Sequence, residues 1–324
     1  MFDYHLHTPF CRHAEGPMEQ YVGEALARGL QEICFTPHIP LPGFARGPEG
    51  LRMEPRDAEP YFREIERLRA CYPQLSILCG VEADFYDGFE KSVEEFLGSY
   101  PLDLVLMSVH FVRDWPGENW VFGFDFPDRP LAAVYHDYFQ AMKRGIASGL
   151  YDAVAHLDLI RQPGHPVLAT NSGDVEEVLA LAARAGMSLE INTAGMRRSW
   201  KLPYPLPEIL PLAAERGLAV ITGSDAHQPH LVGHGFAEVD GWIAASPALR
   251  RVRYRGRQPL RPEILQPETA VAGPIPGSTR GESGPPHQPC HQDCKLYENY
   301  AKRVVRRSTD ASYRDLHTPK ERKK

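Results

Sequence analysis

Three histidines stand close together near the start of the chain, in the stretch FDYHLHTPFCRH. They are His5, His7 and His13. His5 and His7 are two residues apart, so in a β-strand their side chains lie on the same face. Neutral imidazoles bind zinc, iron and manganese, and two of them on one face could hold one ion together. Taken alone, the stretch is equally compatible with ordinary surface or core histidines.

Further histidines and acids follow the same pattern along the chain. Each stands at or just beyond the end of a short run that is typical of a β-strand, as in FTPHIP, GVEADF, MSVH, AHLD and GSDAH. Random placement would not select one end of every run. The candidate metal ligands predicted in this way are His5, His7, His13, His38, Glu82, His110, His156, Asp225 and His227.

The elements that must position these residues alternate between strands and helices. Helix patterns cover residues 18–29, 57–72, 131–145, 175–186 and 206–217, and several end at a glycine. Such alternation predicts βα units and a parallel sheet. The seven expected strands favour a barrel over an open sheet, and residues 249–260 could add an extended closing segment. These strands are FDYHLH, EICFTPH, SILCGVEADF, DLVLMSVHF, AVAHLDL, SLEINTAG and AVITGSDAH.

A βα barrel assembles its active site from the C-terminal ends of several strands, which is where the candidate ligands fall. Nine ligands are too many for one ion, so we expect a cluster of two or three, with a carboxylate such as Glu82 able to bridge two of them. Metal ions about 3.5–4 Å apart polarise a phosphoryl oxygen and generate a hydroxide nucleophile near neutral pH.

Composition excludes several other classes of protein. The net charge of −6 gives no general attraction to nucleic acid or to acidic membranes. We find no run of eighteen apolar residues and no signal-peptide pattern, so we expect neither a transmembrane helix nor secretion. The six cysteines are scattered without a CxxC pair, which indicates a reducing cytoplasm.

The C-terminal part of the chain differs from the rest. We expect residues 1–267 to form the barrel and residues 268–324 to be a Pro/Gly-rich linker and a basic tail, both disordered. The stretch from Lys295 onward carries ten Lys or Arg against four acids. It is a solvated tail or, alternatively, a basic arm that touches RNA or a partner. No feature of the sequence sets an oligomeric state.

Taken in order, these motifs resemble the polymerase and histidinol phosphatase (PHP) superfamily over residues 1–260. The resemblance implies a distorted seven-stranded, TIM-like βα barrel with up to three metal ions, and in-line attack on phosphorus by a metal-bridging hydroxide. It also implies three sets of ligands. The first is His5, His7, Glu82 and Asp225, the second is Glu82, His110 and His156, and the third is His13, His38 and His227.

Within the superfamily the chain is most similar to histidinol-phosphate phosphatases, through GVEADF, LEINTAGMRR and the arginine after AHLDLI. This implies hydrolysis of L-histidinol phosphate, a small phosphate ester. One alternative is a related enzyme for nucleotides, sugar phosphates or phosphotyrosine. Another is a regulatory module without catalysis, which the nine ligand-competent positions disfavour.

Two sets of residues are candidates for substrate contacts. The resemblance favours Arg161 and Arg197 as a clamp on the phosphate, because one guanidinium group can donate two parallel hydrogen bonds to two phosphate oxygens. The alternative is that both are ordinary arginines on surface loops. Glu190 and Asn192 alternate onto one face of the sixth strand and could reach the ammonium or imidazole of the substrate, or serve only the structure.

The loop after the fourth strand is rich in aromatic residues. They could stack on an imidazole, form a lid, or build a small satellite core beneath the loop. Asp84 and Asp158 could orient ligand histidines. The aromatic residues are Phe111, Trp115, Trp120, Phe122 and Phe124.

Overall fold

The structure is a computed structural model that describes residues 1–41, 50–113, 115, 120–122 and 128–260. The predicted linker and tail of residues 268–324, and Phe124 of the aromatic loop, therefore lie outside the described residues. Among the described helices, none is both long enough and apolar enough to cross a membrane.

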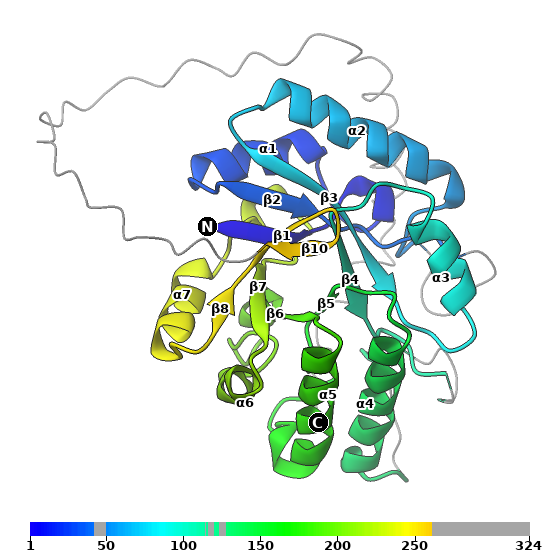
Figure 1. Ribbon diagram of the computed structural model, residues 1–324, viewed down its shortest axis with the longest axis vertical. Helices are drawn as coiled ribbons and strands as arrows, with labels where there is room; N and C mark the ends of the chain where they lie inside the picture. Colours follow the sequence, from blue (N-terminus) through cyan, green and yellow to red (C-terminus); the bar gives the residue numbers. More distant parts are fainter. Residues whose placement is uncertain (42–49, 114, 116–119, 123–127, 261–324) are drawn as a thin grey trace, which may run out of the picture.

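Eight parallel strands form one curled sheet in which strands that follow one another along the chain are neighbours (Figure 1). The seven expected strands are all present in order, and the eighth comes from the predicted closing segment. The strands are β1 (Phe2–Leu6), β2 (Glu32–Phe35), β3 (Ser76–Asp84), β4 (Leu104–Ser108), β5 (Ala153–Val154), β6 (Ser188–Asn192), β7 (Ala219–Gly223) and β8 (Arg250–Arg251).

The barrel closes between its first strand and the segment that follows β7. The backbone nitrogen of His7 donates to the carbonyl of Ala226 at 3.0 Å, and Leu6 and Ala226 form a parallel bridge. The short strand β8 pairs only with the start of β7. The predicted distorted, TIM-like βα barrel is confirmed, with β8 as an additional strand.

Helices lie outside the strands (Figure 1). The five predicted helices are present, although α5 begins earlier than expected, with a break at Asn171, and α6 is shorter because a 3₁₀ turn at Pro207–Ile209 precedes it. The short helices α3 and α7 were not predicted. The helices are α1 (Met18–Ala27), α2 (Ala58–Cys71), α3 (Glu90–Leu97), α4 (Leu131–Ala147), α5 (Leu168–Arg184), α6 (Leu210–Glu215) and α7 (Phe236–Ala245).

A hairpin of β9 (Arg253–Arg255) and β10 (Gln258–Leu260) covers the N-terminal ends of the strands. Tyr254 from β9 joins a buried cluster with residues of β1 to β5 and β7, and its hydroxyl donates to the carbonyl of Asp152, just before β5. Arg253 donates to Glu32, the first residue of β2, at 2.7 and 3.0 Å. Because the described residues fill this end of the barrel, the cavity that holds the predicted ligands opens at the C-terminal ends of the strands.

Candidate metal centre

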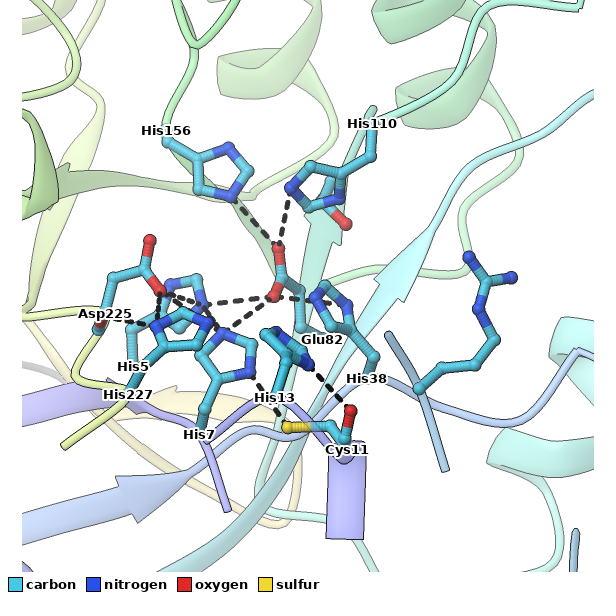
Figure 2. Close-up of polar contacts among 12 residues, drawn as sticks. His5, His7, Cys11, His13, His38, Glu82, His110, His156, Asp225 and His227 are labelled. Carbon is cyan, nitrogen blue, oxygen red and sulfur yellow. Dashed lines mark hydrogen bonds and ion pairs between the residues drawn. The ribbon is translucent and has the colours of Figure 1, made fainter. Parts of the chain in front are cut away.

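All nine predicted metal ligands meet at the C-terminal ends of the strands (Figure 2). Each is delivered by a strand or by the first residues after it, as in a βα-barrel active site. His5 and Glu82 belong to β1 and β3, whereas the other ligands follow a strand. His7 and His13 follow β1, His38 follows β2, His110 follows β4, His156 follows β5, and Asp225 and His227 follow β7.

Glu82 lies at the centre of this cluster with only 1% of its surface exposed. Its two carboxylate oxygens face different sets of imidazoles, as a carboxylate that bridges two ions must. Oε2 is 3.2 Å from His5 Nε2 and 3.3 Å from both His7 Nε2 and His38 Nδ1. Oε1 is 3.0 Å from His156 Nε2 and 3.9 Å from His110 Nε2.

Asp225 is the second acid of the cluster. Its Oδ1 atom is 3.2 Å from His7 Nε2, 3.8 Å from His5 Nε2 and 3.4 Å from His227 Nδ1. The ring of His13 lies beside this group, with its centroid 4.7 Å from that of His227. Imidazole and carboxylate donors are those that zinc, iron and manganese take in proteins, so the chemistry of this donor set fits such ions.

Several triplets of donor atoms are close enough together to share one ion. His5, His7 and Asp225 form one triplet, in agreement with the first predicted set. His38 joins His7 and Glu82 in another, although it was expected with His13 and His227. The remaining triplets are His5, Glu82 and His156; His38, Asp84 and His110; and His7, Cys11 and His13.

The cluster sets the ionisation of its own members. Burial alone would raise the pKa of Glu82 and of Asp225, but the surrounding imidazoles hold the pKa of both carboxyl groups well below its usual range. Burial alone would lower the pKa of His5 and His7, yet neighbouring groups, acids among them, raise it well above its ordinary value. A metal ion that binds these two rings must therefore displace protons, and its affinity must fall as the pH falls.

Two of the ligand residues have a strained backbone. His156 has a φ of 25° and Asp225 a φ of 52°, in the left-handed region where a side chain costs roughly 1–2 kcal/mol. Both residues stand where the chain turns out of a strand, after β5 and after β7. Strain of this kind persists where surrounding contacts hold it, and it is concentrated at functional sites.

Glu190 and Asn192 lie behind the ligands, fully buried. Glu190 Oε1 is 2.7 Å from His5 Nδ1, and its Oε2 accepts from the backbone nitrogen of His156 at 2.9 Å. Asn192 Nδ2 donates to Glu190 Oε2 at 3.1 Å and to Asp225 Oδ2 at 3.3 Å. Neither side chain lines the cavity. Their polar groups are engaged with the predicted ligands, and a contact of either side chain with the substrate stays a prediction.

The two aspartates expected to orient ligand histidines differ in position. Asp84 Oδ1 is 2.8 Å from His110 Nδ1, so this expectation is confirmed. Asp158 instead accepts from Arg161 Nη1 at 2.9 Å and from the backbone nitrogen of Leu206 at 3.1 Å. Both donors use Oδ2, and Oδ1 has no hydrogen-bond partner among the described residues, so an orienting role of Asp158 stays a prediction.

A cavity of about 460 Å³ opens above the cluster. Phe111, Trp120 and Phe122 from the aromatic loop line it, and the rings of Trp120 and Phe122 each lie 6.0 Å from that of His110. Trp115 does not line the cavity; it is buried and donates to Asp137. The cavity therefore joins the metal-binding residues to an aromatic wall.

The arginines occupy two different environments. Arg197 lines the cavity, and its guanidinium donates to the carbonyls of Ser224 at 2.8 Å and Asp225 at 2.9 Å, thereby bracing the turn that carries Asp225. Arg198 also lines the cavity and lies over the ring of Phe122. Arg161 is not part of the lining. It is 5% exposed and donates to Asp158 and to the carbonyls of Leu202 and Pro203.

Cys11 is a member of the cluster that the sequence analysis passed over. Its Sγ atom is 3.4 Å from His7 Nδ1, and its carbonyl oxygen is 2.7 Å from His13 Nδ1 (Figure 2). The sequence feature that could have identified Cys11 is its position between these two histidines in HLHTPFCRH.

Comparison with known proteins agrees with this geometry. The model of the PHP domain family matches residues 3–194, and that of the PHP-associated family matches residues 208–251. A probable histidinol-phosphatase of Deinococcus radiodurans is 39% identical over 241 residues, which cover 73% of this chain and 90% of the relative. A histidinol-phosphatase of Bacillus subtilis is 31% identical over 260 residues, covering 72% and 96%.

The fold also has a counterpart among solved structures. A histidinol phosphate phosphatase from Lactococcus lactis, solved in complex with zinc, L-histidinol and phosphate, has a TM-score of 0.68 at 23% identity. The match covers 80% of this chain and 98% of that one. From the matched PHP domain and from these relatives, we conclude that the chain belongs to the PHP domain family.

Proposed function

We propose that this chain hydrolyses L-histidinol phosphate to L-histidinol and phosphate. The observation that carries the proposal is a cluster of nine ligand-competent residues, five of them buried and four partly buried, at the floor of a cavity that also presents arginines and an aromatic wall. The names of the relatives in Deinococcus radiodurans and Bacillus subtilis support the choice of substrate.

We further propose that the cluster holds two or three ions of zinc, iron or manganese. His5, His7, Glu82 and Asp225 would hold the first ion. Glu82, with His110 and His156, would hold the second, and His13, His38 and His227 the third. Ions of this kind supply Lewis acidity toward water and toward a phosphoryl oxygen.

The chain's own residues would divide the remaining work. Arg197 and Arg198 on the cavity wall would bind the phosphate, because a guanidinium group can donate two hydrogen bonds to two of its oxygens. Arg161 stays a predicted member of the clamp. The aromatic wall of Trp120 and Phe122 offers faces on which the imidazole of the substrate can stack.

We place the reaction in the cytoplasm, where thiols stay reduced. Cys11, Cys34 and Cys79 form no disulfide in the described part of the chain, which supports this compartment.

The decisive experiment is a phosphate-release assay with L-histidinol phosphate beside other phosphomonoesters and a single-stranded oligonucleotide, with metal content read from the same sample. We expect kcat/KM for L-histidinol phosphate to exceed the others by orders of magnitude. Equal rates across the panel would overturn the choice of substrate.

Two ligand variants complete this test. His5→Ala and Asp225→Ala should lose metal and nearly all turnover while keeping the fold. The control is His136→Ala, an exposed histidine paired with Asp174 on the surface, which should keep both. Full turnover in His5→Ala or Asp225→Ala would contradict the metal assignment.

A further inference from the structure

His7 lies in the middle of the cluster. Its Nε2 atom is 3.2 Å from His5 Nε2, 3.3 Å from Glu82 Oε2 and 3.2 Å from Asp225 Oδ1. Its ring also stacks on that of His227, with the centroids 4.0 Å apart. A rotation of this one ring would therefore disturb both acids of the cluster.

The other ring nitrogen of His7 points away from the acids and toward Cys11. The distance between His7 Nδ1 and Cys11 Sγ is 3.4 Å, and both residues are at most 1% exposed. Sulfur accepts hydrogen bonds from ring N–H groups at such distances. Cys11 is thus the hydrogen-bond partner that the structure gives to the outer face of His7.

Cys11 is itself held firmly. It ends a 3₁₀ turn, Pro9–Cys11, whose first residue follows the cap Thr8. Its thiol donates to the carbonyl of Thr8 at 2.9 Å, so the lone pairs of the sulfur are left for His7. Its own carbonyl meets Nδ1 of His13 at 2.7 Å. One residue therefore contacts the outer nitrogens of two neighbouring ligands, one through its side chain and one through its backbone.

We propose that Cys11 is a positioning residue whose sulfur accepts the Nδ1–H of His7 and so fixes the ring with the Nε2 lone pair toward Glu82 and Asp225. A ligating nitrogen must carry no proton, so the proton of the neutral ring has to reside on Nδ1. The inference rests on the proposed metal centre and deepens it.

Other ligands of the cluster use carboxylates in the same place. Glu190 meets Nδ1 of His5 at 2.7 Å, and Asp84 meets Nδ1 of His110 at 2.8 Å. For His7 the acceptor in this place is the sulfur of Cys11. The partners of ligand histidines set ring orientation, and their loss typically lowers metal affinity roughly 10- to 100-fold.

The test compares Cys11→Ala with Cys34→Ala in the full-length, zinc-loaded chain. Cys34 is an equally buried cysteine in β2, and its thiol meets the carbonyl of Phe35 and no imidazole. The readout is zinc affinity, measured by competition with a chelator and independent of any substrate. We expect Cys11→Ala to bind zinc roughly 10- to 100-fold more weakly, Cys34→Ala to match the parent chain, and Cys11→Ser to recover part of the loss.

A second measurement keeps the inference testable if Cys11→Ala fails to fold. Nitrogen NMR of the zinc-loaded parent chain, with the His7 signals identified by comparison with His7→Gln, should show the proton on Nδ1. Equal zinc affinity in Cys11→Ala and Cys34→Ala, or a proton on Nε2 of His7, would overturn the inference. Loss of zinc binding in the parent chain itself would instead refute the proposed function.

Discussion

The Oε1 atom of Glu190 lies 2.7 Å from the Nδ1 atom of His5, and both residues are completely buried. This contact joins β6 to β1, which are far apart in the sequence. The second oxygen of Glu190 accepts from the backbone of His156, whose φ of 25° is strained. One carboxylate thus orients a ligand on β1 and holds a strained turn after β5.

Replacing Glu190 separates this orienting role from a substrate role. Glu190→Ala should lower metal affinity roughly 10- to 100-fold, because His5 loses the partner that orients its ring. Glu190→Gln, which keeps an acceptor, should lose less. Chelator competition measures the affinity. An increase in KM with unchanged metal affinity would show instead that Glu190 contacts substrate.

Gly223, the last residue of β7, lies directly against the same pair. A Cβ atom there would overlap Glu190 Oε1 and approach the Cβ of His5 too closely. We therefore expect Gly223→Ala to lose bound metal and at least tenfold in kcat, measured by metal analysis and steady-state kinetics. The matched control is Gly173→Ala on α5, where nothing lies within 4 Å of an added Cβ. It should be neutral or slightly stabilising, and equal behaviour of the two variants would contradict the prediction.

The two predicted clamp arginines should respond differently to removal. Arg197→Ala should raise KM for the phosphate ester roughly tenfold or more, because the cavity wall loses a guanidinium, and it should also lower metal content, because the turn that carries Asp225 loses its brace. Arg161→Ala should destabilise the fold by about 3 kcal/mol or more, since it leaves the buried Asp158 without its guanidinium. Steady-state kinetics and thermal unfolding of both variants measure the change in KM and the change in stability. A raised KM with unchanged stability in Arg161→Ala would assign this residue to the phosphate.

Glu32 makes stability depend on pH at the opposite end of the barrel. Burial would raise its pKa, but hydrogen bonds from Arg253, Tyr4 and Ser76 lower the pKa below its ordinary value of 4.5. A depressed folded-state pKa gives stability that is present above the unfolded pKa and is lost as the pH falls through the folded value.

Glu32→Gln should therefore cost about 1–3 kcal/mol near neutral pH and progressively less in acid. Denaturant unfolding at several pH values below 4.5 and at neutrality measures the difference. Glu59→Gln, at a side chain that is 65% exposed, is the control and should change little. A deficit for Glu32→Gln that is the same at every pH would refute the role of its charge.

Removal of residues 268–324 tests the predicted domain boundary. We expect the shortened chain to keep kcat/KM within about twofold and to keep its metals, because every residue of the described cluster lies before the boundary. The measurement is the same phosphate-release assay. A collapse of activity would show that the C-terminal segment belongs to the catalytic unit.

The sequence predicted which residues gather at the site because strand ends are easy to recognise and all converge in a parallel barrel. His110 and Asp225 needed only the end of a strand to be placed. The helix α3 was missed because it has only eight residues, and α7 because its apolar residues do not gather on one face, so it lacks an amphipathic pattern. The strand β8 contains only two residues, and its pairing depends on β7 rather than on its own pattern.

How far a side chain lies from the opening of the cavity was not predictable in the same way. Glu190 shares the strand-end position and the polar character of a site residue, but alternation along a strand tells which face a side chain takes and not how far it lies from the opening. Cys11 was passed over for a related reason. Its contact with His7 arises from a turn, and the conformation of that turn is not encoded in any regular spacing.

The backbone bonds between His7 and Ala226 have a consequence for the order in which the protein is made. The strand β1 is made before the other described strands, and it cannot be closed on both edges until the residues after β7 have been synthesised. During most of translation, His5 and His7 therefore cannot contact Asp225, because Asp225 has not yet been synthesised. A complete set of predicted ligands therefore exists only once nearly the whole barrel has folded. We expect the chain to bind metal tightly only after that point.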